Sequence, residues 1–297
     1  MKFVIAGASG FLGTAWAEHL EKQGHEVTRL VRRPAGRGES TWDPYSGKLD
    51  RDLVEQADVV ANLAGANLAH FPFNAKYQKV FRDSRLVTTR VLAEAIAASA
   101  NKPAFLAQNG VAGYGDRGAA VVTEDDPTNA DTFLGRLTVE WEDATRPAGD
   151  AGARVVVLRT SVVLDRRGGA MGAVLTPFRL GVGGRIGSGE QYFATISMDD
   201  WMNATTHLAE SETASGPYNL VGPGTTTNAE YTKTLARHLH RPAVIPVPAF
   251  AIRRALGPVS SDLLGSLRLE PRRIIDEGFE FRHDDLDSRV AAALRPH

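Results

Sequence analysis

Three glycines set three residues apart are the first group in this sequence whose spacing could do chemistry. Gly7, Gly10 and Gly13 follow the apolar run KFVIA and open a helical pattern, so they are predicted to lie between a strand and a helix. Glycines there permit a tight turn, close approach of a pyrophosphate and close packing of helix on strand. An ordinary strand-to-helix turn is the alternative. The predicted phosphate-binding turn consists of Gly7, Ser9, Gly10, Phe11, Leu12 and Gly13.

The end of the next predicted strand indicates which dinucleotide would bind. The run EVTRLV, residues 26–31, follows at the spacing of a βαβ unit and ends where the adenosine ribose would lie. An NAD site usually offers a carboxylate at this point, whereas this chain offers Arg32 and Arg33. Paired arginines at a strand end are often only solvated, but here they suit a 2′-phosphate. The sequence therefore predicts NADP as the cofactor.

The elements that must position this turn alternate between strands and helices. This alternation predicts an α/β protein with a parallel, doubly wound Rossmann sheet. Asn62-Leu63-Ala64-Gly65 closes one strand with small residues, as a backbone beside a cofactor requires, although a simple turn would look the same. Arg85 is a candidate phosphate ligand. Further strand-like runs lie at residues 39–42, 59–63, 104–107 and 154–158, and a long helix is expected over roughly 76–98.

The second half of the chain is expected to form a smaller lobe. We predict a Rossmann domain over residues 1–165, with a strand returning near 216–221. A mostly helical substrate lobe then covers residues 166–297 and includes a small C-terminal domain at about 245–297, where prolines punctuate short elements. This lobe would close over the nicotinamide end of the cofactor.

The composition excludes several classes of function. The 297 residues include no cysteine, which excludes disulfides and thiolate chemistry. Thirty-four basic and 35 acidic side chains give a net charge of -1, so no global field attracts nucleic acid or an anionic membrane. Scattered histidines predict no metal site, and no Gly-x-Ser-x-Gly elbow indicates a serine hydrolase. With no leader pattern and no apolar stretch of about 18 residues, we expect a cytoplasmic protein without a membrane partner.

Several motifs together resemble a known family. They are the glycine turn, Asn62–Gly65, RDSR at 82–85, RTSVVL at 159–164, PFRLG at 177–181 and GSG at 187–189. Over nearly its whole length the chain resembles the atypical extended short-chain dehydrogenase/reductases. More narrowly, it resembles the nucleoside-diphosphate-sugar epimerase-like family with its own short C-terminal domain. The resemblance implies NADP contact by Arg32, Leu63, Ala64, Arg85 and Val163 beside the glycine turn, with Trp42 and Asp43 near the adenine.

The same resemblance implies a gap in the machinery for proton transfer. In this superfamily a serine or threonine and a Tyr-x-x-x-Lys pair move the proton while hydride moves to or from nicotinamide. Alignment by eye puts Asn109 at the serine or threonine position, and Leu134 and Thr138 at the tyrosine and lysine positions. Leucine cannot transfer a proton. Asn109 could hydrogen-bond a carbonyl or hydroxyl, and Tyr114 is the nearest phenol, although a tyrosine in a Tyr-Gly turn is more often structural.

Phe193 bears on the substrate. By the same register it stands where sugar-nucleotide epimerases usually carry an arginine for the substrate diphosphate, and an aromatic ring cannot replace that charged contact. We therefore expect a small carbonyl or alcohol substrate for an NADP-dependent oxidoreductase or epimerase-like enzyme. The alternative is a non-catalytic NADP-binding sensor or partner-binding protein. A homodimer through the long helix is expected by superfamily analogy alone.

Overall fold

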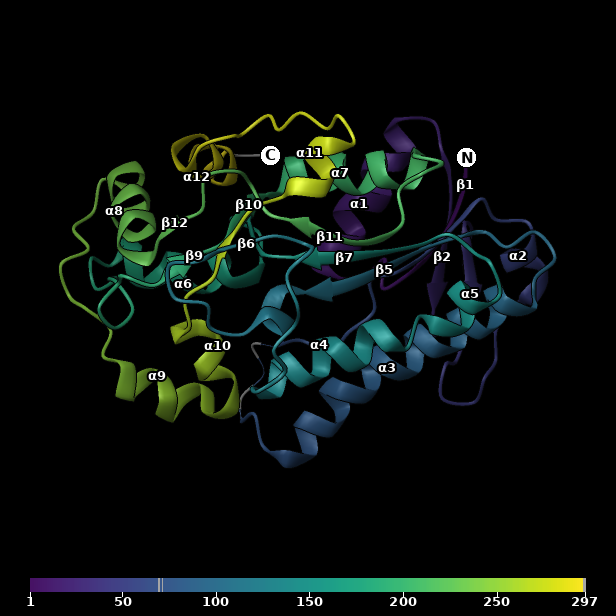
Figure 1. Cartoon of the computed structure of the whole chain (residues 1–297), viewed down its shortest axis with the longest axis horizontal. Helices are drawn as coiled ribbons and strands as arrows, with labels where there is room; N and C mark the ends of the chain where they lie inside the picture. Colours follow the sequence, from purple (N-terminus) through teal and green to yellow (C-terminus); the bar gives the residue numbers. More distant parts are fainter. Residues whose placement is uncertain (69, 71, 296–297) are drawn as a thin grey trace. The chain divides into compact units, whose positions relative to one another are not determined.

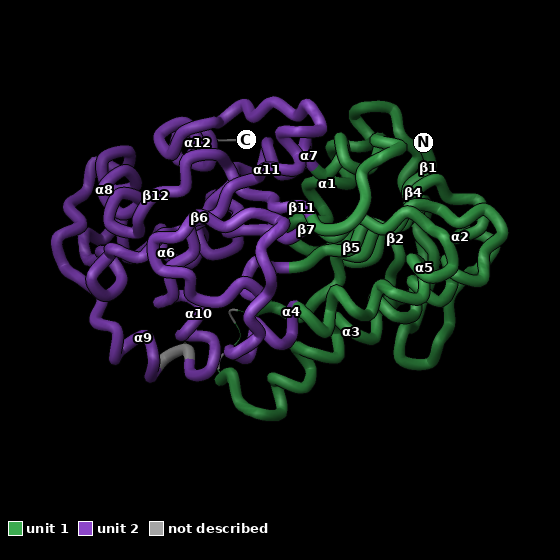
Figure 2. The backbone as a smooth tube through the Cα atoms, viewed as in Figure 1, with its two compact units in different colours: residues 1–109, 139–158, 205–217 green, residues 110–138, 159–204, 218–297 purple. Residues whose placement is uncertain are grey.

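The chain folds into two compact units, shown in different colours in Figure 2. The computed structural model describes residues 1–68, 70 and 72–295, and only the backbone at 255 and 256. Unit 1 comprises residues 1–109, 139–158 and 205–217, and unit 2 comprises residues 110–138, 159–204 and 218–297. Each unit is therefore built from three separate stretches of the chain.

A seven-stranded sheet carries the architecture predicted for the first half. Its order is β11-β7-β5-β4-β1-β2-β3, and the pairs β1–β2, β1–β4, β2–β3 and β4–β5 are parallel. The strand order reverses between β1 and β4, which is the switch point where doubly wound sheets bind ligands. This confirms the predicted Rossmann fold class. The strands are β1 (Lys2–Ala6), β2 (Glu26–Val31), β3 (Glu39–Thr41), β4 (Val59–Asn62), β5 (Ala104–Gly110), β7 (Val155–Thr160) and β11 (Gly216–Leu220).

Helices cover both faces of the sheet in unit 1. Figure 1 shows α1 (Phe11–Lys22) on one face and α3 (Ala75–Ala98) with α5 (Arg146–Asp150) on the other. Strands covered on both faces are largely apolar, and β4 is buried at all four positions, with Asn62 as its one polar residue. The Asn74 side chain caps α3 by accepting the Tyr77 N–H, which fixes where that helix begins. One core cluster of this unit includes Val4, Leu30, Val60, Leu92, Ile96 and Phe105. The remaining helices with residues in unit 1 are α2 (Arg51–Glu55), α4 (Phe133–Asp143) and α7 (Met198–Glu210).

Unit 2 is built mostly from short elements. Three two-stranded ladders join β8 to β10 and β6 to β13 in parallel, and β9 to β12 antiparallel. The strands are β6 (Val121–Val122), β8 (Val162–Leu164), β9 (Tyr192–Phe193), β10 (Thr195–Ser197), β12 (Thr226–Thr227) and β13 (Arg268–Leu269). Its helical elements include η1 (Val111–Tyr114), α6 (Gly169–Arg179), α8 (Asn228–Leu239), α9 (Ala249–Leu256), η2 (Gly257–Val259), α10 (Ser260–Leu264), α11 (Arg272–Asp276) and α12 (Leu286–Leu294).

The amphipathic helices of unit 2 meet in one apolar cluster. Side chains of α6, α8 and α12 pack there, among them Leu175, Leu235 and Val290. A reciprocal capping box between Thr227 and Glu230 begins α8, because each side chain bonds the other residue's backbone N–H. This packing explains why the C-terminal segment, although irregular, is held in place.

Candidate functional site

The glycine turn between β1 and α1 has the shape that its spacing predicts. Gly7 adopts a φ of +81°, and a Cβ atom there would lie 2.5 Å from the Ala64 nitrogen. A Cβ on Gly13 would lie 2.2 Å from the Gly7 carbonyl oxygen. Both positions therefore require glycine, the first for its backbone conformation and contact with the end of β4, the second for close packing of the helix. The Leu63 carbonyl carbon, in the same peptide bond as the Ala64 nitrogen, would also lie 2.5 Å from that Cβ.

The first turn of α1 is open to a ligand. Gly10 occupies the N-cap position and supplies no side-chain hydrogen bond, and the first turn contains no acidic residue. Ser9 and Gly10 are exposed, while Phe11 and Leu12 are half-buried. Backbone N–H groups at such a helix start have no partner within the helix and carry positive charge. The turn is therefore a ready site for an anion such as a pyrophosphate.

Asn62 fixes the bend that follows β4. Its buried amide donates to Thr88 Oγ1 at 3.1 Å and to Thr89 Oγ1 at 2.7 Å, and its Oδ1 accepts the Ala64 N–H at 3.1 Å. The side chain thus ties the segment that touches Gly7 to helix α3. The sequence motif showed the small residues here, but not this positioning role. An asparagine at the end of a buried strand was the available signal, since a buried amide must find partners.

The two arginines after β2 differ in their partners. Arg33 forms a bidentate ion pair with Glu39, with N–O distances of 2.6 and 2.7 Å. This pair, helped by the Gly36 N–H, lowers the pKa of Glu39 to about 2. Arg32 is exposed and has no ion pair within the described part of the chain. Only Arg32 therefore presents a guanidinium that is not already neutralised.

Trp42 and Asp43 follow the edge strand β3. Trp42 is 3% exposed and packs in the unit 1 core with Leu30 and Val54, so its ring faces the interior. Asp43 is half-buried, and its carboxylate accepts the Tyr45 N–H at 3.1 Å. Hydrogen bonds within this turn, that of Ser46 foremost, lower the pKa of Asp43. The adenine contact of these two residues stays a prediction.

Arg85 projects from α3 beside the end of β4. Its guanidinium donates to the carbonyl oxygens of Ala66 at 3.2 Å and Phe81 at 3.0 Å, and its Cζ lies 3.6 Å from the centre of the Phe81 ring. Burial lowers the pKa of Arg85 to about 10, which leaves it charged at neutral pH. Part of its surface stays accessible, and a Cβ on Gly65 would lie 3.0 Å from its Cζ.

This guanidinium has no carboxylate partner among residues 1–68, 70 and 72–295. A desolvated cation that is balanced only by carbonyl oxygens and an aromatic face is electrostatically incomplete. Arg85 is thus a strong candidate for binding an anion at this edge of the sheet.

Tyr114 lies in the interior of unit 2. Its side chain is fully buried, its hydroxyl accepts from Arg159 Nη1 at 2.7 Å, and it donates to Asn219 Oδ1 at 2.8 Å. Burial raises the pKa of this phenol. A hydroxyl committed in this way speaks against Tyr114 as the proton donor, and the structure gives it a structural role. Asn109 is also buried, near the end of β5.

Helix α4 carries the two positions aligned with the missing tyrosine and lysine. The Thr138 hydroxyl donates to the Gly135 carbonyl at 2.9 Å, and its methyl would lie 3.5 Å from a Cβ on Gly110. Thr138 therefore packs against Gly110, the last residue of β5. Leu134 is half-buried one turn earlier. The position expected for a catalytic phenol thus holds an aliphatic side chain.

The surroundings of Phe193 are apolar. Its ring lies 5.1 Å from that of Tyr231 and packs against the cluster of α6 and α8, and Val163 is buried on β8. The neighbouring Tyr192 ring lies 5.3 Å from the guanidinium of Arg268.

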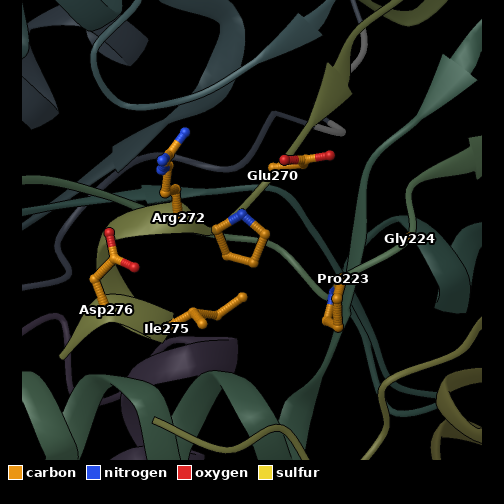
Figure 3. A pocket seen from close by; sticks show the side chains of 7 residues that line it. Pro223, Gly224, Glu270, Arg272, Ile275 and Asp276 are labelled. Atoms are coloured by element: carbon orange, nitrogen blue, oxygen red, sulfur yellow. The ribbon is translucent and has the colours of Figure 1, made fainter. Parts of the chain in front are cut away.

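An open hollow of about 250 Å³ in unit 2 lies apart from these residues. Figure 3 shows the side chains around it, which come from two segments of unit 2. They are Pro223, Gly224, Glu270, Pro271, Arg272, Ile275 and Asp276. None of the residues predicted from the sequence to act in a site belongs to it.

Comparison with known proteins identifies the family. Residues 3–221 match the model of the NAD dependent epimerase/dehydratase family. The chain belongs to this family. Residues 247–293 match a second model, described as a domain of unknown function, DUF1731. Both matches agree with the resemblance that the motifs predict, including its short C-terminal domain.

Relatives of this family align over almost the whole chain. Epimerase family protein ML0860 of Mycobacterium leprae is 38% identical over 295 residues, covering 98% of this chain and 95% of its own. A crystal structure of human epimerase family protein SDR39U1 (isoform 2) with NADPH has a TM-score of 0.91 at 38% identity and covers 99% of both chains. A nucleoside-diphosphate sugar epimerase from Corynebacterium glutamicum has a TM-score of 0.82 at 33% identity, covering 99% of this chain and 58% of its own.

The described residues contain neither a candidate membrane-spanning helix nor a candidate metal-binding cluster. No helix there has both the length and the apolar character needed to cross a bilayer. No group of three or more histidine, aspartate or glutamate side chains in residues 1–68, 70 and 72–295 could hold a metal ion.

Proposed function

We propose that this chain is an NADP-dependent oxidoreductase of the extended short-chain dehydrogenase type that acts on a small carbonyl or alcohol. One observation carries the proposal. The open start of α1 lies at the end of β1, and unneutralised guanidinium groups stand at the ends of the two neighbouring strands, Arg32 after β2 and Arg85 beside β4. A dinucleotide carrying a pyrophosphate and a 2′-phosphate matches this distribution of charge.

The residues present fit this cofactor in detail. The Gly7–Gly13 turn leaves room for the pyrophosphate, and the backbone N–H groups of α1 would bind it. Ala6 pairs with Leu30 on one side and Asn62 on the other, so the ends of β2 and β4 flank the turn. This arrangement supports Arg32, after β2, and Arg85, beside the end of β4, as ligands on opposite sides of the pyrophosphate. Arg32 would then hold the 2′-phosphate. The crystal structure of human SDR39U1 with NADPH supports NADP as the cofactor.

Bound NADP would supply hydride transfer to or from a carbon of the substrate. The chain's own part is to orient the carbonyl, and Asn109 is the polar side chain at the aligned position near the end of β5. Leu134 cannot exchange a proton, and the Thr138 hydroxyl already donates to Gly135. The proposal therefore requires water as the proton donor, since Tyr114 is committed within unit 2.

The apolar setting of Phe193 supports a small substrate without a nucleotide. Phe193 and Tyr231 occupy a region where a diphosphate would need cationic partners. A cytoplasmic location is part of the proposal, because the chain has no cysteine to mark an oxidising compartment. Fractionation of cells that express the tagged protein would test the location.

A second candidate is a non-catalytic NADP-binding protein. It is favoured by the sealed hydroxyl of Tyr114 together with the leucine at position 134. Such a protein would retain the anion-binding edge of unit 1 and use the cofactor for structure or signalling.

Incubation of the purified protein with NADPH and a panel of small carbonyl compounds separates the two candidates. Carbonyl-dependent oxidation of NADPH that falls in Asn109→Ala but not in the neighbouring Gln108→Ala supports the oxidoreductase. A shift in NADPH fluorescence without oxidation by any carbonyl supports the binding protein instead. Absence of affinity for NADPH in calorimetry contradicts both.

A further inference from the structure

Unit 2 exposes a concentration of large apolar side chains on two segments. Leu180 and Val182 come from the loop after α6, Val244 and Ile245 come from the segment that precedes α9, and Phe250 lies in the first turn of α9. Each is between 53% and 80% exposed. Scattered single exposed apolar residues are normal in proteins, but a contiguous group marks a contact surface.

Backbone contacts hold these two segments together. The Val247 N–H donates to the Arg185 carbonyl at 2.8 Å, and the Gly187 N–H donates to the Val247 carbonyl at 2.9 Å. A Cβ on Gly184 would lie 1.7 Å from the Ile245 carbonyl oxygen, so the backbones of the two segments are in contact there. Figure 2 shows the segment between α8 and α9 at the edge of unit 2. The two segments that carry these exposed side chains therefore lie next to each other.

The charged residues of these two segments are all positive. Residues 179–189 and 240–261 contain no aspartate or glutamate. Their five arginines are all exposed, and none has an ion pair in the part of the chain that the structure describes. They are Arg179, Arg185, Arg241, Arg253 and Arg254. We call these arginines and the five exposed apolar residues the basic-apolar patch.

We propose that the basic-apolar patch docks this protein on an anionic lipid surface. Arginines around apolar side chains match the boundary between headgroups and acyl chains, where the stems lie along the lipid and the guanidinium groups reach the phosphates. Clustered arginines beside an anionic leaflet add attraction that an uncharged bilayer lacks.

The charge of the patch argues against a second copy of this chain as the occupant. A two-fold symmetric contact through these segments would bring their arginines close to those of the second copy, and like charges repel. The apolar side chains also have most of their surface exposed, as contact with lipid acyl chains requires. From the net charge of -1, the sequence predicts no membrane partner. That net charge sums over the whole chain and does not reveal a local group of arginines.

Co-sedimentation of the full chain with lipid vesicles tests the proposal. One set of vesicles contains phosphatidylcholine alone, and the other contains equal parts of phosphatidylcholine and phosphatidylserine. Arg253→Gln with Arg254→Gln removes charge, and Val244→Ser with Phe250→Ser removes apolar surface. The matched control is Arg272→Gln with Ile275→Ser, which changes an exposed arginine and an exposed isoleucine on α11. Thermal unfolding of each variant checks that the fold is kept.

We expect the wild type to bind the mixed vesicles and not the neutral ones, with binding that weakens as salt is added. The double arginine variant should bind roughly thirtyfold more weakly. The double apolar variant should lose roughly tenfold or more. The control should bind as the wild type does.

Failure of the wild type to bind the mixed vesicles overturns the proposal. Equal loss in the control variant also overturns it. So does sedimentation velocity that shows a dimer disrupted by the apolar substitutions, because the patch would then be a contact between copies. The experiment contains no nicotinamide nucleotide, so its outcome is independent of the proposed oxidoreductase function.

Discussion

The cofactor edge of unit 1 and the Tyr114 network of unit 2 handle polar groups in opposite ways. At the cofactor edge, the start of α1 has no side-chain cap, Arg32 has no ion pair in the described chain, and Arg85 has only carbonyl and aromatic partners. In the network, the Tyr114 hydroxyl is bonded on both sides, by Arg159 and Asn219. Unsatisfied cationic groups indicate a ligand, whereas a closed network indicates structure.

This difference explains how a chain can keep a dinucleotide site without the usual pair for proton transfer. Binding depends on backbone geometry and on guanidinium groups, all of which lie in unit 1. Proton transfer would depend on one phenol, and Leu134 stands at its aligned position. The two functions are separable because different residues carry them.

The largest effect should come from closing the glycine turn. Gly7→Ala places a methyl 2.5 Å from the Ala64 nitrogen at a φ of +81°. Strain and overlap together should cost about 2–6 kcal/mol of stability and abolish NADPH binding. Thermal unfolding and calorimetry measure the two losses.

Gly24→Ala is the matched control for that substitution. Gly24 has a similar φ of +86° but nothing lies within 4 Å of its Cβ position, so only the backbone strain of about 1–3 kcal/mol applies. If the two substitutions destabilise the protein equally and both variants still bind NADPH, then the close contact at Gly7 is not needed for the turn to bind the cofactor.

Next in size is the loss of a phosphate contact in Arg85→Gln. Affinity should fall roughly 10- to 150-fold, and equally for NADPH and NADH, because Arg85 lies across β1 from Arg32. Stability should change little, because two effects oppose each other. The substitution removes a charge whose burial is unfavourable to folding, as the lowered pKa of about 10 indicates, but it also removes the hydrogen bonds to the carbonyls of Ala66 and Phe81. Arg90→Gln, an exposed position on α3, is the control. A loss of affinity for NADPH but not for NADH would indicate that Arg85 binds the 2′-phosphate rather than the pyrophosphate.

Removing the Tyr114 hydroxyl should change stability and leave binding alone. Tyr114→Phe strands the buried partners Arg159 and Asn219 and should cost about 1–3 kcal/mol in denaturant unfolding. Tyr231→Phe is the control, because this buried phenol has no hydrogen bond in the described residues, and its removal should cost less than about 0.5 kcal/mol. A fall in turnover at unchanged stability would instead make Tyr114 a catalytic residue.

The smallest effect concerns Glu124, which joins the same network by accepting the Asn219 N–H at 2.9 Å. Burial raises the pKa of Glu124 above its ordinary value of 4.5. The folded state therefore binds this proton more tightly than the unfolded state does, and stability is lost as pH rises from 4.5 through the raised pKa. Glu124→Gln should lack this slope, so the stability of wild type relative to the variant should fall with pH. A difference that rises with pH would reverse the assignment.

Much of the fold and of the cofactor edge could be predicted from local patterns. The alternation of strands and helices predicted a parallel, doubly wound sheet, and the spacing of Gly7, Gly10 and Gly13 predicted the turn. These signals are short-range, because a strand, a turn and a helix follow one another in the chain.

What could not be predicted depends on partners distant in sequence. Nothing near Tyr114 reveals that its hydroxyl meets Arg159 and Asn219, 45 and 105 residues away. The burial of Trp42 depends on packing against other strands and helices. The pairing of Arg33 with Glu39 spans only six residues, yet it requires β2 and β3 to be parallel neighbours. Local sequence patterns do not predict side-chain contacts that depend on tertiary packing.

Calorimetric titration with NADPH and NADH tests the central claim most directly, using wild type, Arg32→Ala and Arg33→Ala. We predict that the wild type prefers NADPH. Arg32→Ala should lose roughly 10- to 150-fold for NADPH and little for NADH, because only the 2′-phosphate is affected. Arg33→Ala, whose guanidinium is paired with Glu39, should lose less. Equal losses for both nucleotides in Arg32→Ala, or no affinity of the wild type for either, would contradict the account.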